Sequence, residues 1–334
     1  MRRVFKILLI LGVATVLLLG AALLWLNQPM ALRLPPGAQV ADLEIEPGTS
    51  ANGVAETVVA SGADVPVGML QAWFRFSGQA RLIKAGSYEL VPGTTPRKLL
   101  RMLVRGEEAL KSITLVEGWT FVQVRAALQK AEQLVPDTLA LSPEMIMKKL
   151  GKPGIHPEGR FFPDTYAYAK GSSDLALLKR AARAMDRRLD AAWSLRSSDT
   201  PLKSPEQALI LASIVEKETG KPSDRAQIGG VFSNRLRIGM PLQTDPTVIY
   251  GLGLQFDGNL RKRDLQADTP YNTYTRLGLP PTPIAMPGKA ALLAAVQPAP
   301  TKALYFVARG DGSSEFSTHL DEHNRAVNKY IRGH

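Results

Sequence analysis

The stretch Ser204–Gly220, SPEQALILASIVEKETG, predicts the central helix of a mixed α+β domain. Ser204 can cap this helix, Pro205 suits its first turn, and Gln207 lies where it completes a capping box. The helix is expected to end near Gly220, because glycine commonly follows the last helical residue. Apolar residues recur at the spacing of one helix face, which should pack on a hydrophobic core; they are Ile210, Leu211, Ile214 and Val215.

Two glutamates lie near the end of this predicted helix. Glu218 falls on the apolar face, one turn beyond Ile214, and Glu216 falls on the opposite side. Residues two apart on a helix point in nearly opposite directions, so the two carboxyls are not expected to act as a pair. A carboxyl among aliphatic side chains has a raised pKa, as a general acid near neutral pH requires. Glu218 is therefore the catalytic candidate, unless it turns to solvent or pairs with Arg225 or Arg235.

The N-terminus predicts a membrane anchor. Ile7–Leu26 is 20 residues without a charge, and at ~1.5 Å per residue it spans ~30 Å, the hydrocarbon thickness of a bilayer. Arg2, Arg3 and Lys6 precede it, so the positive-inside rule places the N-terminus in the cytoplasm. Residues 1–27 are expected to form a cytoplasmic tip and a single-pass anchor in the cell inner membrane, with the rest of the chain periplasmic. A cleaved signal peptide fits less well, because its apolar region is normally ~7–15 residues and no clear small-x-small cleavage site follows.

Composition narrows the possible chemistry. The 334 residues are 45% hydrophobic and 21% charged, as in globular proteins. They include no cysteine, which excludes disulfides, iron–sulfur clusters, thiol nucleophiles and cysteine-bound zinc. The formal net charge is +11, and part of it falls on an expected helix over Leu177–Asp190. Nucleic acid is not expected as a partner, because aromatic residues do not interleave the charges. Anionic lipid headgroups, an anionic cell-wall polymer or simple solubility explain the charge better.

Three similar sequence units follow a proline-containing linker expected at 28–40. They are IEPGTS (Ile45–Ser50), LVPGTT (Leu90–Thr95) and LVEGWT (Leu115–Thr120). Each joins a short apolar strand, a glycine turn and a serine or threonine that can cap a helix. The repetition predicts a small α+β module over 41–130 that carries no catalytic group. Its expected role is binding or spacing, or structure alone.

The region 153–334 is expected to form a mixed α+β catalytic domain around the central helix. Two long segments, Met240–Gly253 and Asp268–Gly288, combine hydrogen-bonding side chains and tyrosines with stiff prolines. Such segments suit a groove that binds sugar hydroxyls and acetamido groups and covers sugar rings with aromatic faces, and they also suit purely structural loops. The candidates for holding the sugars are Gln243, Thr244, Tyr271, Asn272 and Tyr274.

Several of these stretches carry a resemblance to a known family. SIVEKET (Ser213–Thr219), FSNRLRIGMPLQTDPTVIYGLG (Phe232–Gly253), YNTYTRLGLPPTPIAMPG (Tyr271–Gly288) and LYFVARGDG (Leu304–Gly312) resemble the YceG-like (MltG) family of endolytic murein transglycosylases. The likeness covers nearly the whole chain. It implies a membrane-anchored lyase with LysM-like repeats and without cofactor or metal. Such an enzyme cuts peptidoglycan glycan strands internally, between N-acetylmuramic acid and N-acetylglucosamine, and leaves 1,6-anhydro ends.

The resemblance also implies a catalytic residue and a mechanism. The family's catalytic glutamate is the second in the E-K-E triplet, which here is Glu218. Glu218 would protonate the glycosidic oxygen, and the substrate's acetamido group can stabilise the oxocarbenium-like centre. As a carboxylate, Glu218 would then take the proton of the C6 hydroxyl as this attacks C1, so no second carboxylate is needed. Near the membrane such an enzyme is expected to act on nascent strands, to terminate their polymerisation, and to have peptidoglycan synthases as neighbours.

Three other interpretations remain at this point. A lysozyme-like muramidase would combine Glu218 with a base or nucleophile such as Asp245 or Glu158 and would give reducing ends. A zinc hydrolase could use His319 and His323, which are four apart, but the zincin motif needs a glutamate directly after its first histidine. A non-catalytic scaffold that binds the cell wall would need no acid at Glu218.

Overall fold

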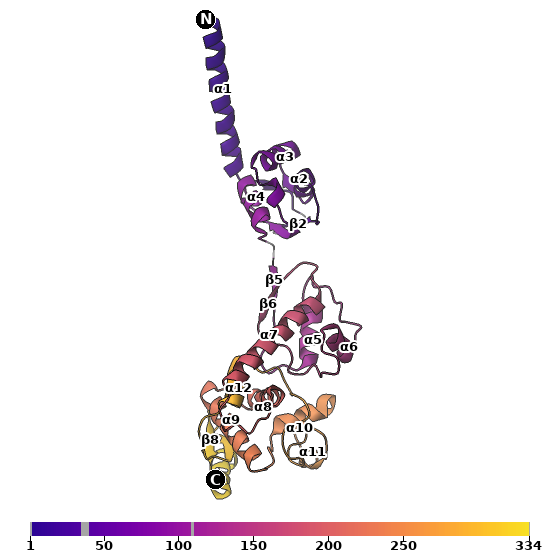
Figure 1. Cartoon of the computed structure of the whole chain (residues 1–334), viewed down its shortest axis with the longest axis vertical. Helices are drawn as coiled ribbons and strands as arrows, with labels where there is room; N and C mark the ends of the chain where they lie inside the picture. Colours follow the sequence, from indigo (N-terminus) through magenta and orange to yellow (C-terminus); the bar gives the residue numbers. More distant parts are fainter. Residues whose placement is uncertain (1, 35–39, 108–109, 334) are drawn as a thin grey trace. The chain divides into compact units, whose positions relative to one another are not determined.

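The computed structural model describes residues 2–34, 40–107 and 110–333, and the chain divides into two compact units (Figure 1). Unit 1 is Met1–Lys111 and unit 2 is Ser112–His334. Unit 1 has one hydrophobic core and unit 2 has two. Each unit is thus held together by buried side chains of its own.

Unit 1 begins with the predicted apolar helix. Helix α1 (Arg2–Asn27) contains the segment Leu8–Asn27, which has a mean hydropathy of 2.6 and is long and apolar enough to cross a membrane. Most of its side chains are exposed; Leu18 and Leu24, for example, keep 71% and 69% of their surface. Such a surface is stable only in a non-aqueous environment.

The globular part of unit 1 is a small α+β fold. Two antiparallel strand pairs form it, β1 (Ala31–Leu32) with β3 (Ala63–Asp64) and β2 (Ala41–Ile45) with β4 (Gly86–Leu90). The helical elements are α2 (Ala51–Ala60), α3 (Val67–Phe76), the short 3-10 helix η1 (Ala80–Leu82) and α4 (Pro96–Arg105). Fully buried side chains such as Leu43, Val54, Phe74 and Leu99 fill its core.

The expected linker is part of this fold, where the structure describes it. Met30 is buried, and its backbone N–H donates to the carbonyl of Thr94 at 2.8 Å. The following residues form β1, and the N–H of Arg33 donates to the carbonyl of Gly62 at 2.8 Å. Residues 35–39 lie outside the described part. The first half of the segment expected as a linker over 28–40 thus packs on the fold, because strand pairing and the buried Met30 hold it despite its lack of helical pattern.

The three predicted strand–glycine–cap units all form. Ser50, Thr95 and Thr120 each accept a hydrogen bond from the backbone N–H three residues on, at 3.1–3.4 Å. The preceding turns place glycine in the left-handed region, as at Gly118 with φ 76°. Local turn and cap chemistry was sufficient to predict these three helix starts.

The third of these units belongs to unit 2, so the expected module 41–130 crosses a unit boundary. Its strand β5 (Leu110–Thr114) pairs with β6 (Thr165–Ala169). Its helix α5 (Phe121–Lys130) shares a core with α6 (Pro143–Lys149) and the first half of α7 (Asp174–Ser194). Some residues that pack on this third unit, such as Met286, lie far away in sequence. The backbone N–H of Met286 donates to the carbonyl of Trp119 at 2.7 Å.

The second core of unit 2 surrounds α8 (Pro205–Glu218). Helices α7, α9 (Pro222–Arg237) and α12 (Lys289–Val296) pack against it. Every residue from Ala208 to Val215 is buried, so the middle of α8 is covered on all sides instead of having one apolar face. Ser213 is fully buried because its hydroxyl donates to the carbonyl of Ile210 at 2.7 Å and accepts from the N–H of Ile284 at 3.0 Å.

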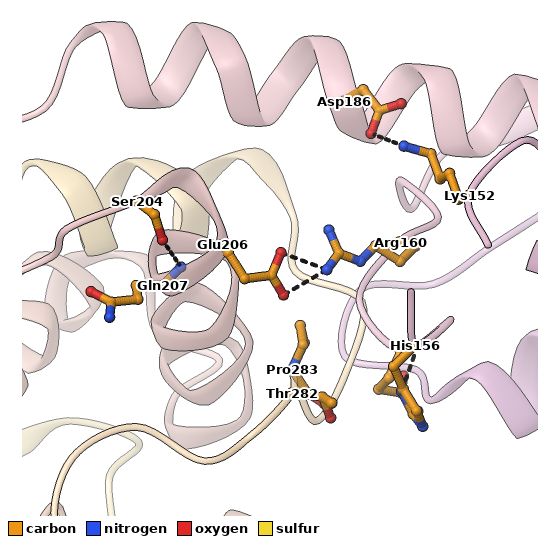
Figure 2. Close-up of polar contacts among 10 residues, drawn as sticks. Lys152, His156, Arg160, Asp186, Ser204, Glu206, Gln207, Thr282 and Pro283 are labelled. Carbon is orange, nitrogen blue, oxygen red and sulfur yellow. Dashed lines mark hydrogen bonds and ion pairs between the residues drawn. The ribbon is translucent and has the colours of Figure 1, made fainter. Parts of the chain in front are cut away.

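Polar contacts fix the start of α8 (Figure 2). Ser204 accepts from the N–H of Gln207 at 3.3 Å, as predicted. The Gln207 side chain, however, accepts from the N–H of Lys203 at 2.7 Å, so only half of the expected capping box forms. Arg160 donates to both carboxylate oxygens of Glu206 at 2.5 Å. This ion pair fastens the segment before β6 to the first turn of α8.

The remaining elements of unit 2 are short. They are α10 (Asp245–Leu252), η2 (Gly253–Gln255), α11 (Lys262–Gln266), the antiparallel pair β7 (Tyr305–Ala308) and β8 (Ser314–Ser317), α13 (Leu320–Val327) and the π-helical turn η3 (Asn328–Arg332). Helix α10 contacts α8 and starts directly after the segment that reaches Glu218.

Candidate active site

Glu218 is the last residue of α8, at the point where the buried helix ends. Its carboxylate accepts a short hydrogen bond from the hydroxyl of Thr244. Burial raises the pKa of Glu218 to about 7; the Thr244 hydrogen bond lowers it, the charge of Asp245 raises it and that of Arg235 lowers it. A carboxyl with this pKa is present in both protonation states at neutral pH, as an acid–base catalyst requires.

Thr244 is held by a cluster of threonines. It is buried, and its N–H donates to the Thr273 hydroxyl at 3.1 Å. Thr247, in the first turn of α10, donates its hydroxyl to the carbonyl of Thr244 at 2.8 Å and lies 2.9 Å from the Thr273 hydroxyl. The cluster joins the two polar loops and aims the Thr244 side chain at Glu218. The sequence did not single out Thr247 and Thr273, because only their location in the two polar loops connected them with the site.

Gln243 adopts an unusual backbone conformation beside this cluster. Its φ is 49°, in the left-handed region that residues other than glycine seldom occupy. Its N–H donates to the carbonyl of Thr273 at 3.0 Å, and its side chain is exposed. Strained backbone of this kind costs roughly 1–3 kcal/mol and is concentrated at functional sites. The conformation leaves the amide of Gln243 free at the surface next to Thr244.

Asp245 and Tyr274 form the open side of the site. The Tyr274 hydroxyl donates to the Asp245 carboxylate at 2.6 Å. Burial, the Asp245 hydrogen bond and the charges of Asp245 and Glu218 raise the pKa of Tyr274 well above its usual value. Tyr274 is therefore a permanent hydrogen-bond donor or acceptor here and does not act as an acid near pH 7. Asp245 itself is exposed.

Arg235 supports the site from α9. It is buried, with Nε donating to the carbonyl of Leu304 and Nη1 to that of Leu242, both at 2.7 Å. Its guanidinium also lies over the ring of Tyr305, 5.4 Å from the centroid. These bonds tie the segment before Thr244 to α9. Within the described residues Arg235 forms no ion pair with Glu218, so it acts on that carboxyl by its charge alone.

Glu216 has a structural position. Its carboxylate accepts from Arg225 at 3.1 Å and from the N–H of Gly288 at 2.9 Å. The side chains of Glu216 and Arg225 are only 5% and 12% exposed. Arg225 therefore pairs with Glu216, whereas the sequence left it as a possible partner of Glu218. The two glutamates point to different surroundings, as the helical spacing predicted.

Asn272 and Tyr271 do not lie free in a groove. Asn272 is fully buried; its amide nitrogen donates to three backbone carbonyls, the shortest at 2.6 Å to Ala267, and its oxygen accepts from the N–H of Tyr274 at 2.9 Å. Both polar atoms of the Asn272 side chain are thus bonded within the fold, and the structure gives no support to the expected sugar binding by Asn272. The Tyr271 hydroxyl bonds to Thr282 at 2.8 Å, and its ring packs edge-on against Tyr250. Asn272 positions the Tyr274 backbone instead.

Glu158 is the second carboxyl with a strongly shifted pKa. It is 2% exposed, accepts from the N–H of Phe121 at 2.9 Å and from the Tyr250 hydroxyl at 3.1 Å. Burial raises its pKa to about 7, against the opposing effect of these hydrogen bonds. A group this enclosed cannot meet a glycan strand, so its role as a base is not supported.

Glu158 gives a pH-dependent stability. Its folded-state pKa lies above the ordinary value of 4.5, so the folded protein binds the proton more tightly than the unfolded chain. Stability should fall as pH rises from about 4.5 to about 7, by at most about 3 kcal/mol from this group. In urea denaturation at pH 5 and pH 8, Glu158→Gln should therefore lose less stability between the two pH values than the wild type. Exposed Glu132→Gln is the control, and an equal effect of both substitutions would contradict the prediction.

Comparison with known proteins places this chain in a family. The sequence model of the YceG-like family matches residues 43–329. The chain belongs to the YceG-like family. A Bacillus subtilis protein named endolytic murein transglycosylase is 32% identical over 309 residues, which is 87% of this chain and 84% of the relative. A Streptococcus pneumoniae protein of the same name is 29% identical, and the match covers 75% of this chain and about half (51%) of that relative.

A solved structure supports the same assignment. A YceG-like protein from Listeria monocytogenes superposes with a TM-score of 0.53 and 27% sequence identity, over 86% of this chain and 98% of the other. The mixed α+β fold of this YceG-like protein is thus shared with a crystal structure. The LysM-like character of its repeats is not shown by the likeness.

His319 and His323, the histidines of the zinc interpretation, have structural contacts in this YceG-like protein. The N–H of His319 donates to Glu322 at 3.2 Å at the start of α13, and the ring of His323 stacks on Tyr305. Across residues 2–34, 40–107 and 110–333, no three His, Cys, Asp or Glu side chains converge as metal ligands. The zinc interpretation therefore has no geometric support.

Proposed function

We propose that this YceG-like protein is an endolytic lytic transglycosylase of peptidoglycan, with Glu218 as general acid and then base. The observation that carries the proposal is the placement of Glu218, a carboxyl with a pKa of about 7 at the end of a core helix. Exposed hydrogen-bonding groups on Gln243 and Asp245 lie next to the Thr244 that bonds it. The names of the Bacillus subtilis and Streptococcus pneumoniae relatives support this class of reaction.

One carboxyl is sufficient for the proposed reaction. Protonated Glu218 gives its proton to the glycosidic oxygen as the bond from C1 of N-acetylmuramic acid breaks, and N-acetylglucosamine leaves with a free hydroxyl. The C6 hydroxyl of the muramic residue then bonds to C1 and returns its proton to Glu218. The sum is an internal transfer that consumes no water and restores the enzyme. The 1,6-anhydro ring is the product, and no second carboxylate has to accompany a water as in inverting glycosidases.

The surroundings of Glu218 balance its two states. Burial and the charge of Asp245 favour the protonated acid, whereas the Thr244 hydrogen bond and the charge of Arg235 favour the carboxylate. Opposed effects of this size hold the pKa near the working pH, where proton donation and acceptance are both efficient. Gln243 and Tyr274 are proposed to hold the sugars, because their polar atoms lie on the open side of the site.

The end groups of the products test this function. The protein is incubated with uncrosslinked peptidoglycan in water labelled with heavy oxygen, and the fragments are identified by mass spectrometry. Internal fragments should end in 1,6-anhydromuramic acid without the label. Labelled reducing ends would instead establish a muramidase and would make Asp245 the candidate for its second carboxylate. The last arm uses full-length wild-type protein inserted in a bilayer. If this protein leaves the strands uncut, both reactions are contradicted and a scaffold role is favoured.

Thr244 should control the pH profile. Its hydrogen bond lowers the pKa of Glu218, so Thr244→Val should raise that pKa and move the alkaline limb of kcat/KM upward. A hydrogen bond to a charged group is worth about 1.5 kcal/mol, which corresponds to about one pH unit. Thr247→Val is the matched control, because it removes a buried hydroxyl of the same cluster that does not bond Glu218. Equal profiles for the two variants would refute the role of Thr244.

The place of action is proposed from α1 and from the rest of unit 1. We propose that α1 is a single-pass inner-membrane anchor with its N-terminus in the cytoplasm and the catalytic site in the periplasm. The length of its apolar span and the basic residues before that span support this orientation. The repeats of unit 1 are proposed to be LysM-like and to bind glycan. An anchored site meets nascent strands first, so the enzyme would terminate polymerisation beside peptidoglycan synthases. Release from the anchor should lengthen the strands in cells.

A further inference from the structure

Helix α3 presents apolar side chains to the outside of unit 1. Phe76 is 84% exposed and Met69 is 41% exposed. With Ala72 and Trp73 they form one wall of a groove of about 530 Å³. The other wall comes from α1, through Leu19, Ala22, Leu23, Trp25 and Leu26. A phenylalanine this exposed next to further apolar side chains is costly in water and marks an interaction site.

The depth of this groove follows from α1. Leu19 lies eight residues before Asn27, the end of the candidate span, which is ~12 Å along a helix axis. If α1 crosses a bilayer, the groove that Leu19 shares with α3 lies at the level of lipid chains. The end of α1 is fixed to unit 1, because Leu26 is buried and the N–H of Met30 donates to Thr94. Unit 1 therefore cannot move away from the membrane surface without breaking these contacts.

A row of arginines lies beside the groove. Arg97, Arg101 and Arg105 are exposed and are spaced four apart on α4, which contains no acidic residue. They line a cavity of about 510 Å³ together with Trp73. Like charges at this spacing destabilise a helix. Within the described residues, only one of these three arginines forms an ion pair. It is Arg105, which pairs with Glu107 at 3.5 Å, and both side chains are largely exposed.

We propose that unit 1 binds an anionic phospholipid of the adjacent leaflet, with an acyl chain in the α1–α3 groove and the phosphate in the arginine cavity. Trp73 lines both spaces, and its Nε1 donates to the carbonyl of Pro96 at 3.3 Å, so the tryptophan separates the apolar and the charged part. Aromatic side chains at the membrane–water interface and basic residues above it are the usual pattern of lipid recognition. The inference rests on the proposed anchoring by α1.

A single fluorescent label tests the immersion of α3. The chain contains no cysteine, so Phe76→Cys accepts one polarity-sensitive dye, and Glu44→Cys on β2 is the matched control. Both full-length proteins are inserted into vesicles of phosphatidylcholine and phosphatidylglycerol. The dye at 76 should emit at shorter wavelength and be quenched several-fold more by lipids with a spin label on the acyl chain. Equal quenching at the two positions in protein that floats with the vesicles would overturn the proposal.

A charge variant tests the headgroup. Arg97→Gln/Arg101→Gln/Arg105→Gln is compared with Lys130→Gln/Lys148→Gln/Lys149→Gln, which removes three exposed charges from unit 2. Full-length, dye-labelled protein in uncharged detergent is titrated with short-chain phosphatidylglycerol, phosphatidylcholine or inorganic phosphate. Phosphatidylglycerol should bind at least about ten-fold more tightly than phosphatidylcholine, and the arginine variant should lose this preference while the control keeps it. Saturation by inorganic phosphate alone would contradict a lipid site.

The outcomes separate this inference from the proposed function. Protein that fails to float with vesicles would refute the anchor, whereas protein that floats without a spectral shift refutes only the lipid site. Glycan cleavage by Glu218 is measured independently of both.

Discussion

Glu218→Gln should abolish glycan cleavage while the protein stays folded. Glutamine keeps the size of the side chain and can still accept the hydrogen bond of Thr244, but it can neither donate a proton to the glycosidic oxygen nor take one from the C6 hydroxyl. Because one residue serves in both steps, the loss should be on the order of 10³-fold or more in kcat/KM. Mass spectrometry of the rate at which anhydro ends form tests this expected loss of activity.

The stability of the same variant makes the result specific. The pKa of Glu218 is raised to about 7, so above this pH the wild-type fold carries a poorly solvated charge that glutamine removes. The variant should therefore be at least as stable as the wild type at pH 8 in thermal unfolding. An inactive variant that also unfolds at lower temperature would point to a structural role of Glu218, and an active one would end the proposal.

Glu216→Gln should give the opposite result. It removes the charge that compensates Arg225 in a nearly buried pair, and breaking such a pair costs about 3 kcal/mol or more. Folded molecules should nevertheless cleave glycan at nearly the wild-type rate, because Glu216 does not touch Glu218 or Thr244. Urea denaturation and the specific activity at a permissive temperature check the two expectations.

A double-mutant cycle isolates this ion pair. Arg225→Met and Glu216→Gln should each destabilise the protein, and the combined variant should be more stable than the sum of the two losses predicts. Additive losses would mean that the hydrogen bond of Glu216 to the N–H of Gly288, at 2.9 Å, carries the effect instead. In either case the two glutamates would differ in function: Glu218 would serve in catalysis and Glu216 in the stability of the fold.

Local sequence signals predicted much of the fold. Ser50, Thr95 and Thr120 cap helices as expected, because turn and cap chemistry depends on three or four neighbouring residues. Helical spacing also separated Glu218 from Glu216. Helical spacing could not show that the middle of α8 is buried on every side, because this burial depends on contacts with α7, α9 and α12 that the spacing does not encode.

The rest of the candidate site depends on contacts that spacing does not encode. Thr244 was predicted as a sugar ligand, and the structure shows it bonded to Glu218. Asn272 was chosen for its polar side chain, whose nitrogen bonds to backbone carbonyls at the end of α11 and whose oxygen accepts from the N–H of Tyr274. The left-handed Gln243 gave no signal, because glutamine does not ordinarily take that conformation. Loops with many hydrogen-bonding residues predict a polar site but not which of those residues hold the loop together.

The third strand–glycine–cap unit has a practical consequence for the preparation of the catalytic part. Lys217, next to Glu218, donates to the carbonyl of Gly118 at 3.3 Å, and the N–H of Gly118 donates to Met286 at 2.9 Å. A fragment that starts at the expected boundary, residue 153, would lack Gly118. It would also lack Phe121, whose backbone N–H donates to the carboxylate of Glu158. It would expose half of the core that Phe161 shares with Phe121. The shortest piece that keeps these contacts and the whole of β5 begins at Leu110.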